Sequence, residues 1–147
     1  MSHFFMPTKK KVLFLCSANS ARSLMGEAIL RHLSADQFEV FSAGKEPDRP
    51  QALALQALEA HGVNTSGLAS KSIEALAEHY FDTVFILCEK ALQACHHWKG
   101  GCGQLFYWDI SDPRLHGQLD AYEHTFNDIY QRLSLWLLIE ARDDIRR

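Results

Sequence analysis

Residues 12–23 read VLFLCSANSARS, an apolar run that ends in a cysteine and is followed by small and polar residues as far as an arginine. The apolar part is continuous rather than alternating, which is typical of a strand buried on both faces of a parallel sheet. The apolar residues that follow recur at helical spacing, which indicates an amphipathic helix. We therefore predict a strand over Lys11–Cys16, a helix over Ala21–Leu33 and a tight loop between them.

Strands and helices continue to alternate outward from this unit. Alternation of this kind favours right-handed crossovers and a parallel sheet, so we predict one α/β domain of three layers over residues 1–147, with four parallel strands and helices on both faces. The segment Glu89–Gly103 carries three glycines near its end and is interpreted as a mobile loop. The remaining strands are predicted over 38–42, 82–87 and 104–108, and the remaining helices over 51–61, around 73–78 and from Leu119 onward.

Composition excludes several classes of function. The chain has 147 residues, of which 47% are hydrophobic, enough for one core. The net charge of -3, with acids and bases interspersed, gives no basic stripe for nucleic acid and no polybasic face for a membrane. The opening MSHFFMPTKKK reverses the charge order of a secretory signal, and no apolar run reaches membrane-spanning length. We expect a cytoplasmic protein that binds neither nucleic acid nor membrane.

The loop after Cys16 has the properties of an anion site. Its backbone N–H groups can surround one point, with the N-terminus of the next helix behind them. The same field favours the thiolate of Cys16 as a nucleophile, and Arg22 offers a planar fork to two oxygens of an oxyanion. Ser23 can donate to the Cys16 sulfur, and Asn19 tolerates a left-handed turn. The alternative is a buried core cysteine beside a surface arginine. The predicted oxyanion-binding residues are Ser17, Ala18, Asn19, Ser20, Ala21, Arg22 and Ser23.

Two further chemical groups follow predicted strands. Cys88 comes directly after the third strand and Asp112 soon after the fourth, and ligands of parallel sheets bind where the strands end. We therefore expect both near Cys16. The alternatives are that Cys88 only packs in the core and that Asp112 only caps a turn beside Pro113.

The other cysteines leave their role open. Four cysteines in a chain without an export signal are buried, metal-binding or reactive. Cys95 follows Cys88 in CEKALQAC. In CHHWKGGC the same Cys95 stands near His96, His97 and Cys102, which suggests zinc, although no paired C-x-x-C knuckle supports it.

Several motifs together resemble the low-molecular-weight protein tyrosine phosphatase superfamily. They are VLFLCSANSARS, LMGEAIL, VFSAG and an SDP before the long final helix, and they span nearly the whole chain. The resemblance implies a four-stranded parallel sheet. It also implies Cys16 as nucleophile, Arg22 as oxyanion clamp and Asp112 as general acid.

Within this superfamily, CEKALQAC and a tryptophan shortly before Asp112 resemble the thioredoxin-coupled arsenate reductases. The phosphatases tend to place tyrosines where Arg114 stands. The implied reaction is a relay in which Cys16 attacks arsenate, Cys88 then attacks Cys16 to release arsenite, and Cys95 moves the disulfide to Cys88–Cys95 for thioredoxin or glutaredoxin. No metal, nucleotide or other cofactor is expected. The alternatives are a phosphatase that forms a Cys16 phosphoenzyme, and a thiol-based redox sensor or metal-binding module without turnover.

The chain departs from this family at a few positions. Ala21 stands where a second cysteine is common, His96 stands where a proline is common, and Cys102 is extra, either an alternative resolving thiol or a loop residue. We expect a monomer, with a dimer through apolar residues near the end of the final helix as the alternative. These residues, which either pack in the core or form a modest interface, are Trp136, Leu138 and Ile139.

One further implication of the resemblance concerns potassium. Some of these reductases bind it through residues that match Asn19, Glu27 and Ser42, with a carboxylate where this chain has Lys71. We predict that Lys71 pairs with Glu27 in place of the cation and that activity is insensitive to potassium.

Overall fold

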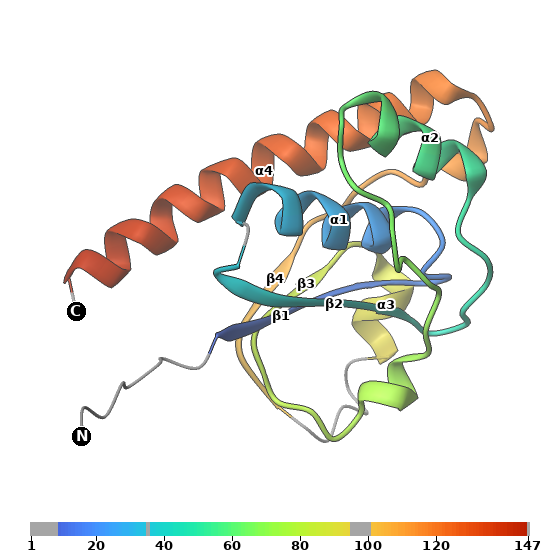
Figure 1. Ribbon diagram of the computed structural model, residues 1–147. Coiled ribbons are helices and arrows are strands. Elements are labelled where there is room, and N and C mark those ends of the chain that lie inside the picture. Colours follow the sequence, from blue (N-terminus) through green and yellow to red (C-terminus); the bar gives the residue numbers. More distant parts are fainter. Residues whose placement is uncertain (1–8, 35, 95–100, 147) are drawn as a thin grey trace.

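Four parallel strands in the order β2-β1-β3-β4 form the centre of the structure, a computed structural model that describes residues 9–34, 36–94 and 101–146 (Figure 1). The first strand lies between two neighbours, because Val12 is paired with Val40 on one side and with Thr83 on the other. This arrangement confirms the predicted four-stranded parallel sheet. The strands are β1 (Lys10–Cys16), β2 (Phe38–Gly44), β3 (Phe81–Ile86) and β4 (Cys102–Tyr107).

Helices cover both faces of the sheet. Figure 1 shows α1, α2 and α4 gathered on one side and α3 on the other, which confirms the predicted layers. Among the described helices, none is both long and apolar enough to cross a membrane. The helices are α1 (Arg22–Ser34), α2 (Ala52–Ala60), α3 (Glu89–Ala94) and α4 (Leu119–Arg146), with short 3₁₀ helices at Ile73–Leu76 and Pro113–Leu115.

The prediction of a loop over Glu89–Gly103 is wrong at its start, where α3 lies. The sequence EKALQA contains only good helix formers, and Glu89 in the first turn interacts favourably with the helix dipole. The backbone N–H of Leu92 donates to the carbonyl of Cys88 (3.2 Å), so the helix begins directly after this cysteine. The glycines that suggested a loop come later and do not affect this segment.

The last strand begins two residues earlier than predicted, at Cys102. This cysteine is paired with Phe81 at the amino end of the sheet, whereas Cys16 closes β1 at the carboxyl end. The six residues Phe81–Ile86 span roughly 16 Å from the first Cα to the last. A disulfide needs Cα atoms within about 7 Å of each other, so Cys102 is wrongly placed to resolve a disulfide at Cys16.

The core is built on β1, where Val12, Leu13, Phe14 and Leu15 are all fully buried. The Phe14 ring stacks on Phe85 of the neighbouring strand, with ring centroids 5.1 Å apart. Helix α1 approaches this ring so closely that a Cβ added at Gly26 would lie 2.6 Å from its Cδ1 atom. This glycine therefore sets the distance between α1 and the sheet, and with it the position of the helix N-terminus behind Cys16.

We predict that Gly26→Ala lowers the free energy of unfolding. Alanine gains about 1 kcal/mol of helix propensity over glycine, but overpacking a rigid core costs typically 1–3 kcal/mol, and a contact of 2.6 Å with a stacked ring lies toward the upper end. We expect a net loss of about 1 to 2 kcal/mol in urea unfolding. In a Phe14→Leu background the loss should shrink, because the clashing ring is gone. An alanine variant as stable as the parent would contradict this packing.

Candidate active site

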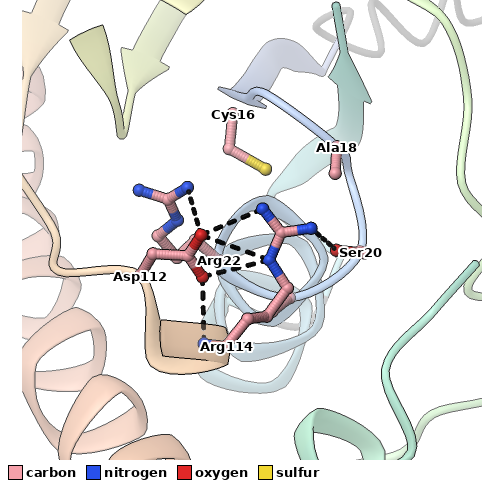
Figure 2. A pocket seen from close by; sticks show the side chains of 7 residues that line it. Cys16, Ala18, Ser20, Arg22, Asp112 and Arg114 are labelled. Atoms are coloured by element: carbon pink, nitrogen blue, oxygen red, sulfur yellow. Dashed lines mark hydrogen bonds and ion pairs between the residues drawn. The ribbon is translucent and has the colours of Figure 1, made fainter. Parts of the chain in front are cut away.

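Cys16, at the carboxyl end of β1, lies at the base of a small, tightly lined pocket (Figure 2). Its side chain is buried, with 2% of the residue exposed. The walls come from three parts of the chain that are distant in sequence: the loop after β1, the start of α1 and the loop after β4. The lining residues are Cys16, Ala18, Ser20, Ala21, Arg22, Asp112 and Arg114.

The loop after Cys16 is held from its outer side. Four successive carbonyl groups, from Ser17 to Ser20, accept hydrogen bonds from the segments 46–51 and 70. With the carbonyl groups engaged outside, the amide N–H groups of the loop are left to face the pocket. The donors and acceptors are Glu46 N and Ser17 O (2.8 Å), Asp48 N and Ala18 O (2.9 Å), Ser70 Oγ and Asn19 O (2.6 Å), and Gln51 N and Ser20 O (2.8 Å).

Asn19 is the fully buried centre of this loop and has a left-handed backbone, with φ of 47°. Its Nδ2 donates to Ser23 Oγ (2.7 Å), and its Oδ1 accepts from the backbone N–H of Lys71 (2.7 Å). Ser23 Oγ in turn lies 2.8 Å from Cys16 Sγ. Because Asn19 occupies a lone pair of the Ser23 oxygen, the hydroxyl hydrogen is free to point at the sulfur, where it stabilises a thiolate.

The predicted arginine and aspartate meet in the pocket. Arg22 donates from Nη1 to the carbonyl of Ile110 (3.0 Å), and its Nη2 lies 3.5 Å from Asp112 Oδ2. Asp112 also caps the 3₁₀ helix that begins at Pro113, since Oδ1 accepts from the backbone N–H of Arg114 (3.0 Å). The capping alternative and the pocket position are thus compatible, because one carboxylate fulfils both.

Arg114 is a pocket residue that sequence reasoning missed. Its Nη2 donates to Asp112 Oδ2 (2.9 Å), its Nε lies 3.1 Å from Oδ1, and its Nη1 reaches Ser20 Oγ at 3.4 Å. Burial raises the pKa of the Asp112 carboxyl, but the hydrogen bonds from Arg114 and the charges of Arg22 and Arg114 outweigh it and lower that pKa below its ordinary value. The only signal in the sequence was an arginine two residues past the aspartate, where phosphatases tend to place a tyrosine.

Cys88 lies at the same edge of the sheet as Cys16. The N–H of Leu87 donates to the carbonyl of Leu15 (2.8 Å), so the chain still runs beside β1 one residue before Cys88. Cys88 is buried, with 7% of the residue exposed, and its thiol is free. The expected juxtaposition of the two strand ends is therefore present.

The remaining predicted thiol and the zinc hypothesis fall mostly outside the described residues. Cys95, His96 and His97 belong to the undescribed segment 95–100, and Cys102 lies at the opposite end of the sheet from Cys16. In the ranges 9–34, 36–94 and 101–146, no three His, Cys, Asp or Glu side chains lie close enough together to hold a metal.

A buried carboxylate supports the site from behind. Glu27 of α1 is 2% exposed, and its Oε2 lies 2.6 Å from Arg31 Nη2. Ser42 Oγ of β2 donates to its Oε1, and Lys71 Nζ lies 3.7 Å from the same atom. The predicted pairing of Lys71 with Glu27 is confirmed, and two cations already neutralise this carboxylate.

Comparison with known proteins gives matches over most of the chain. The family model described as low molecular weight phosphotyrosine protein phosphatase matches residues 11–146. The glutaredoxin arsenate reductase of Synechocystis sp. is 33% identical over 105 residues, which are 71% of this chain and 79% of the relative. An arsenate reductase of Bacillus cereus is 31% identical over 108 residues, 74% of this chain and 80% of the relative. The solved structure of an arsenate reductase in the phosphate binding state superposes with a TM-score of 0.78 at 28% identity, covering 88% of this chain and 97% of that one.

We predict that Gly44→Ala weakens binding of inorganic phosphate roughly tenfold or more, since small displacements in an anion site are costly. A Cβ at Gly44, the last residue of β2, would lie 2.7 Å from the backbone N of Asn19 and 2.9 Å from the carbonyl carbon of Ala18. The loop backbone would have to move, and its N–H groups with it. Calorimetric titration with phosphate measures the effect.

Gly103→Ala is the matched control for this variant. It introduces an equally short contact with backbone, because a Cβ at Gly103 would lie 2.7 Å from the carbonyl oxygen of Asp82, but this contact lies at the amino end of the sheet, away from Cys16. It should bind phosphate as the parent does wherever it is folded. Equal affinities for phosphate in Gly44→Ala and the parent would show that the loop tolerates the added methyl group.

We also predict that potassium does not stabilise this protein more than sodium does. Lys71 and Arg31 neutralise Glu27, so a further cation is repelled, and a cation that does not bind the folded state leaves its melting temperature unchanged. The measurement is the Tm in KCl and in NaCl at equal ionic strength. Lys71→Asp, which removes the ammonium and adds a carboxylate, should create a preference for potassium and so serves as the positive control. A higher Tm in KCl for the parent would refute the prediction.

Proposed function

The chain belongs to the low molecular weight phosphotyrosine protein phosphatase family, and from this premise we propose that it is an arsenate reductase, which converts arsenate to arsenite with electrons from thiols. The observation that carries the proposal is the position of Cys88 at the end of the strand beside that of Cys16. Hydrolysis of a phosphate ester needs a nucleophile, an oxyanion clamp and an acid, but no second thiol. Relatives named arsenate reductase, with 33% and 31% identity, support the same choice.

The pocket suits a tetrahedral oxyanion. The loop N–H groups and the N-terminus of α1 provide positive potential around Cys16, and Arg22 offers a fork to two oxygens. Arsenate and phosphate share this shape and charge, so the binding residues serve both. We assign the oxyanion to the loop from Ser17 to Ser23.

In the first step, the Cys16 thiolate attacks arsenic and forms a sulfur–arsenic bond. One oxygen leaves arsenic as water, with Asp112 as the source of its proton. In the second step, the Cys88 thiolate attacks the sulfur of Cys16, so that the sulfur–arsenic bond breaks and its electron pair stays on arsenic. Arsenic is reduced by two electrons and departs as arsenite, and the two thiols are oxidised to a Cys16–Cys88 disulfide.

Regeneration requires Cys95, whose role rests on the sequence alone. Cys88 directly precedes α3, and Cys95 directly follows its last residue, Ala94. The six residues of α3 rise about 9 Å along the helix axis, more than the 4.4–6.8 Å that usually separates the Cα atoms of a disulfide. We therefore propose that α3 unwinds when a Cys88–Cys95 disulfide forms, which exposes the disulfide to a reductant.

We assign the reduction of this disulfide to thioredoxin or glutaredoxin, with no resident cofactor. We place the protein in the cytoplasm, where the reducing conditions keep such thiols active. Because one copy of the chain carries all of the proposed catalytic residues, we propose that it acts as a monomer.

We predict that Cys88→Ser and Cys95→Ser each lose turnover by a factor of at least about 10², because each removes one thiol of an obligatory sequence. They should differ in a single turnover without reductant: Cys95→Ser still releases one arsenite per protein, and Cys88→Ser releases none. Arsenite release and disulfide mapping by mass spectrometry measure both. Cys102→Ser is the matched control and should turn over normally.

Full turnover in both Cys88→Ser and Cys95→Ser, with thioredoxin, its reductase and NADPH, would rule out the relay. Efficient hydrolysis of aryl phosphates that neither substitution affects would instead select the phosphatase activity, which uses Cys16, Arg22 and Asp112 alone.

A further inference from the structure

Two guanidinium groups converge on one carboxylate in the pocket. Figure 2 shows Arg22 and Arg114 on either side of Asp112, with the sulfur of Cys16 directed toward the Arg114 side. Arg22 Nη2 lies 3.5 Å from Asp112 Oδ2, and Arg114 Nη2 lies 2.9 Å from the same oxygen. Arg22 is the expected clamp, whereas Arg114 has no role in the reaction as derived above.

Arg114 spans the pocket. Its guanidinium contacts Asp112 on one side and Ser20 Oγ of the anion loop at 3.4 Å on the other. Ser20 and Asp112 both line the pocket with Cys16. The guanidinium of Arg114 therefore lies in or next to the space that an oxyanion bound to the loop would occupy. The side chain is 31% exposed, which leaves it room to turn.

The contacts of Arg114 with Asp112 have the form of an oxyanion contact. Nε lies 3.1 Å from Asp112 Oδ1 and Nη2 lies 2.9 Å from Asp112 Oδ2, so two nitrogens of the guanidinium face two oxygens of the carboxylate. The same fork fits two oxygens of arsenate or phosphate equally well. In this pairing, Asp112 provides the negative charge that an oxyanion would provide when bound.

We propose that Arg114 is a second oxyanion-binding residue, which exchanges its pairing with Asp112 for one with the oxyanion when substrate binds. This role adds a binding residue to the proposed active site, and it rests on the proposed function insofar as the oxyanion is arsenate. Together with Arg22, Arg114 places a guanidinium on each side of the oxyanion.

The movement of Arg114 from Asp112 to the oxyanion also favours the protonated form of Asp112. Asp112 faces Arg22 from α1, Arg114 from its own loop, Cys16 from β1 and the buried Tyr122 from α4, whose pKa is raised chiefly by burial and then by the Asp112 charge. When Arg114 turns away and an anion arrives, Asp112 loses hydrogen bonds to its charged form and gains a negative neighbour. Burial then favours the protonated carboxyl, which is the form that donates a proton.

The first experiment titrates inorganic phosphate into Arg114→Gln, Arg114→Lys and the parent by calorimetry. We expect the phosphate Kd to rise roughly tenfold in Arg114→Gln, and less in Arg114→Lys, which keeps the charge but loses the fork. Arg132→Gln is the matched control, because Arg132 also pairs with an aspartate, Asp128 at 2.7 Å, but on the surface of α4. It should leave the phosphate Kd unchanged.

The second experiment removes the competitor. Asp112→Asn should bind phosphate more tightly than the parent, and most of that gain should vanish in the double variant with Arg114→Gln. A residue that only supports the loop would show no such coupling between the two positions. If Asp112→Asn improved the affinity for phosphate equally in the parent and in the Arg114→Gln background, the proposed exchange would be overturned.

The outcomes separate this proposal from the proposed function. A parental phosphate Kd in both Arg114→Gln and Arg114→Lys would overturn the role of Arg114, even if the parent reduces arsenate. Weakened phosphate binding in Arg114→Gln, with no arsenite from the parent, would retain the oxyanion role and reject the reductase.

Discussion

Hydrogen bonds to four successive carbonyl groups hold the loop after Cys16, and the chemistry of the site depends on them. Each accepts a hydrogen bond from outside the loop, three from backbone N–H groups of the segment 46–51 and one from Ser70. The loop N–H groups can then face inward without a loss of backbone hydrogen bonding. Such a loop is organised before the anion arrives, so binding does not have to supply the ordering free energy.

The same loop is tied to the core through Asn19. Its backbone takes the left-handed conformation that an asparagine tolerates, and its amide joins Ser23 on one side to Lys71 on the other. Lys71 also approaches Glu27, one helical turn beyond Ser23 on α1. A buried carboxylate, the anion loop and the hydroxyl beside Cys16 thus belong to one connected network, in which a disturbance at one member reaches the thiol through few contacts.

The sequence allowed the sheet, the strand ends and the position of Cys16, Arg22 and Asp112 to be predicted, because the hydrophobic pattern sets the strands and parallel strands bring their carboxyl ends together. It did not allow α3 or Arg114 to be assigned. The six residues of α3 are too few for a periodic signal, and glycines further along suggested a loop. The contact of Arg114 with Ser20 joins residues 94 positions apart, and no local pattern encodes such a pairing.

The pocket alone does not distinguish hydrolysis from reduction, since every group that contacts the oxyanion would serve phosphate as well as arsenate. The distinction arises outside it, at the end of β3, where a second thiol follows the strand that runs beside β1. When water attacks an adduct on Cys16, the oxyanion is released in its original oxidation state. When Cys88 attacks the sulfur of the adduct instead, as in the proposed relay, two electrons pass to arsenic. Because α3 begins directly after Cys88, the stability of that six-residue helix governs how easily this thiol leaves the core. A helix this short has little stability of its own, which suits the proposed relay, in which Cys88 reacts in the interior and its disulfide is reduced at the surface.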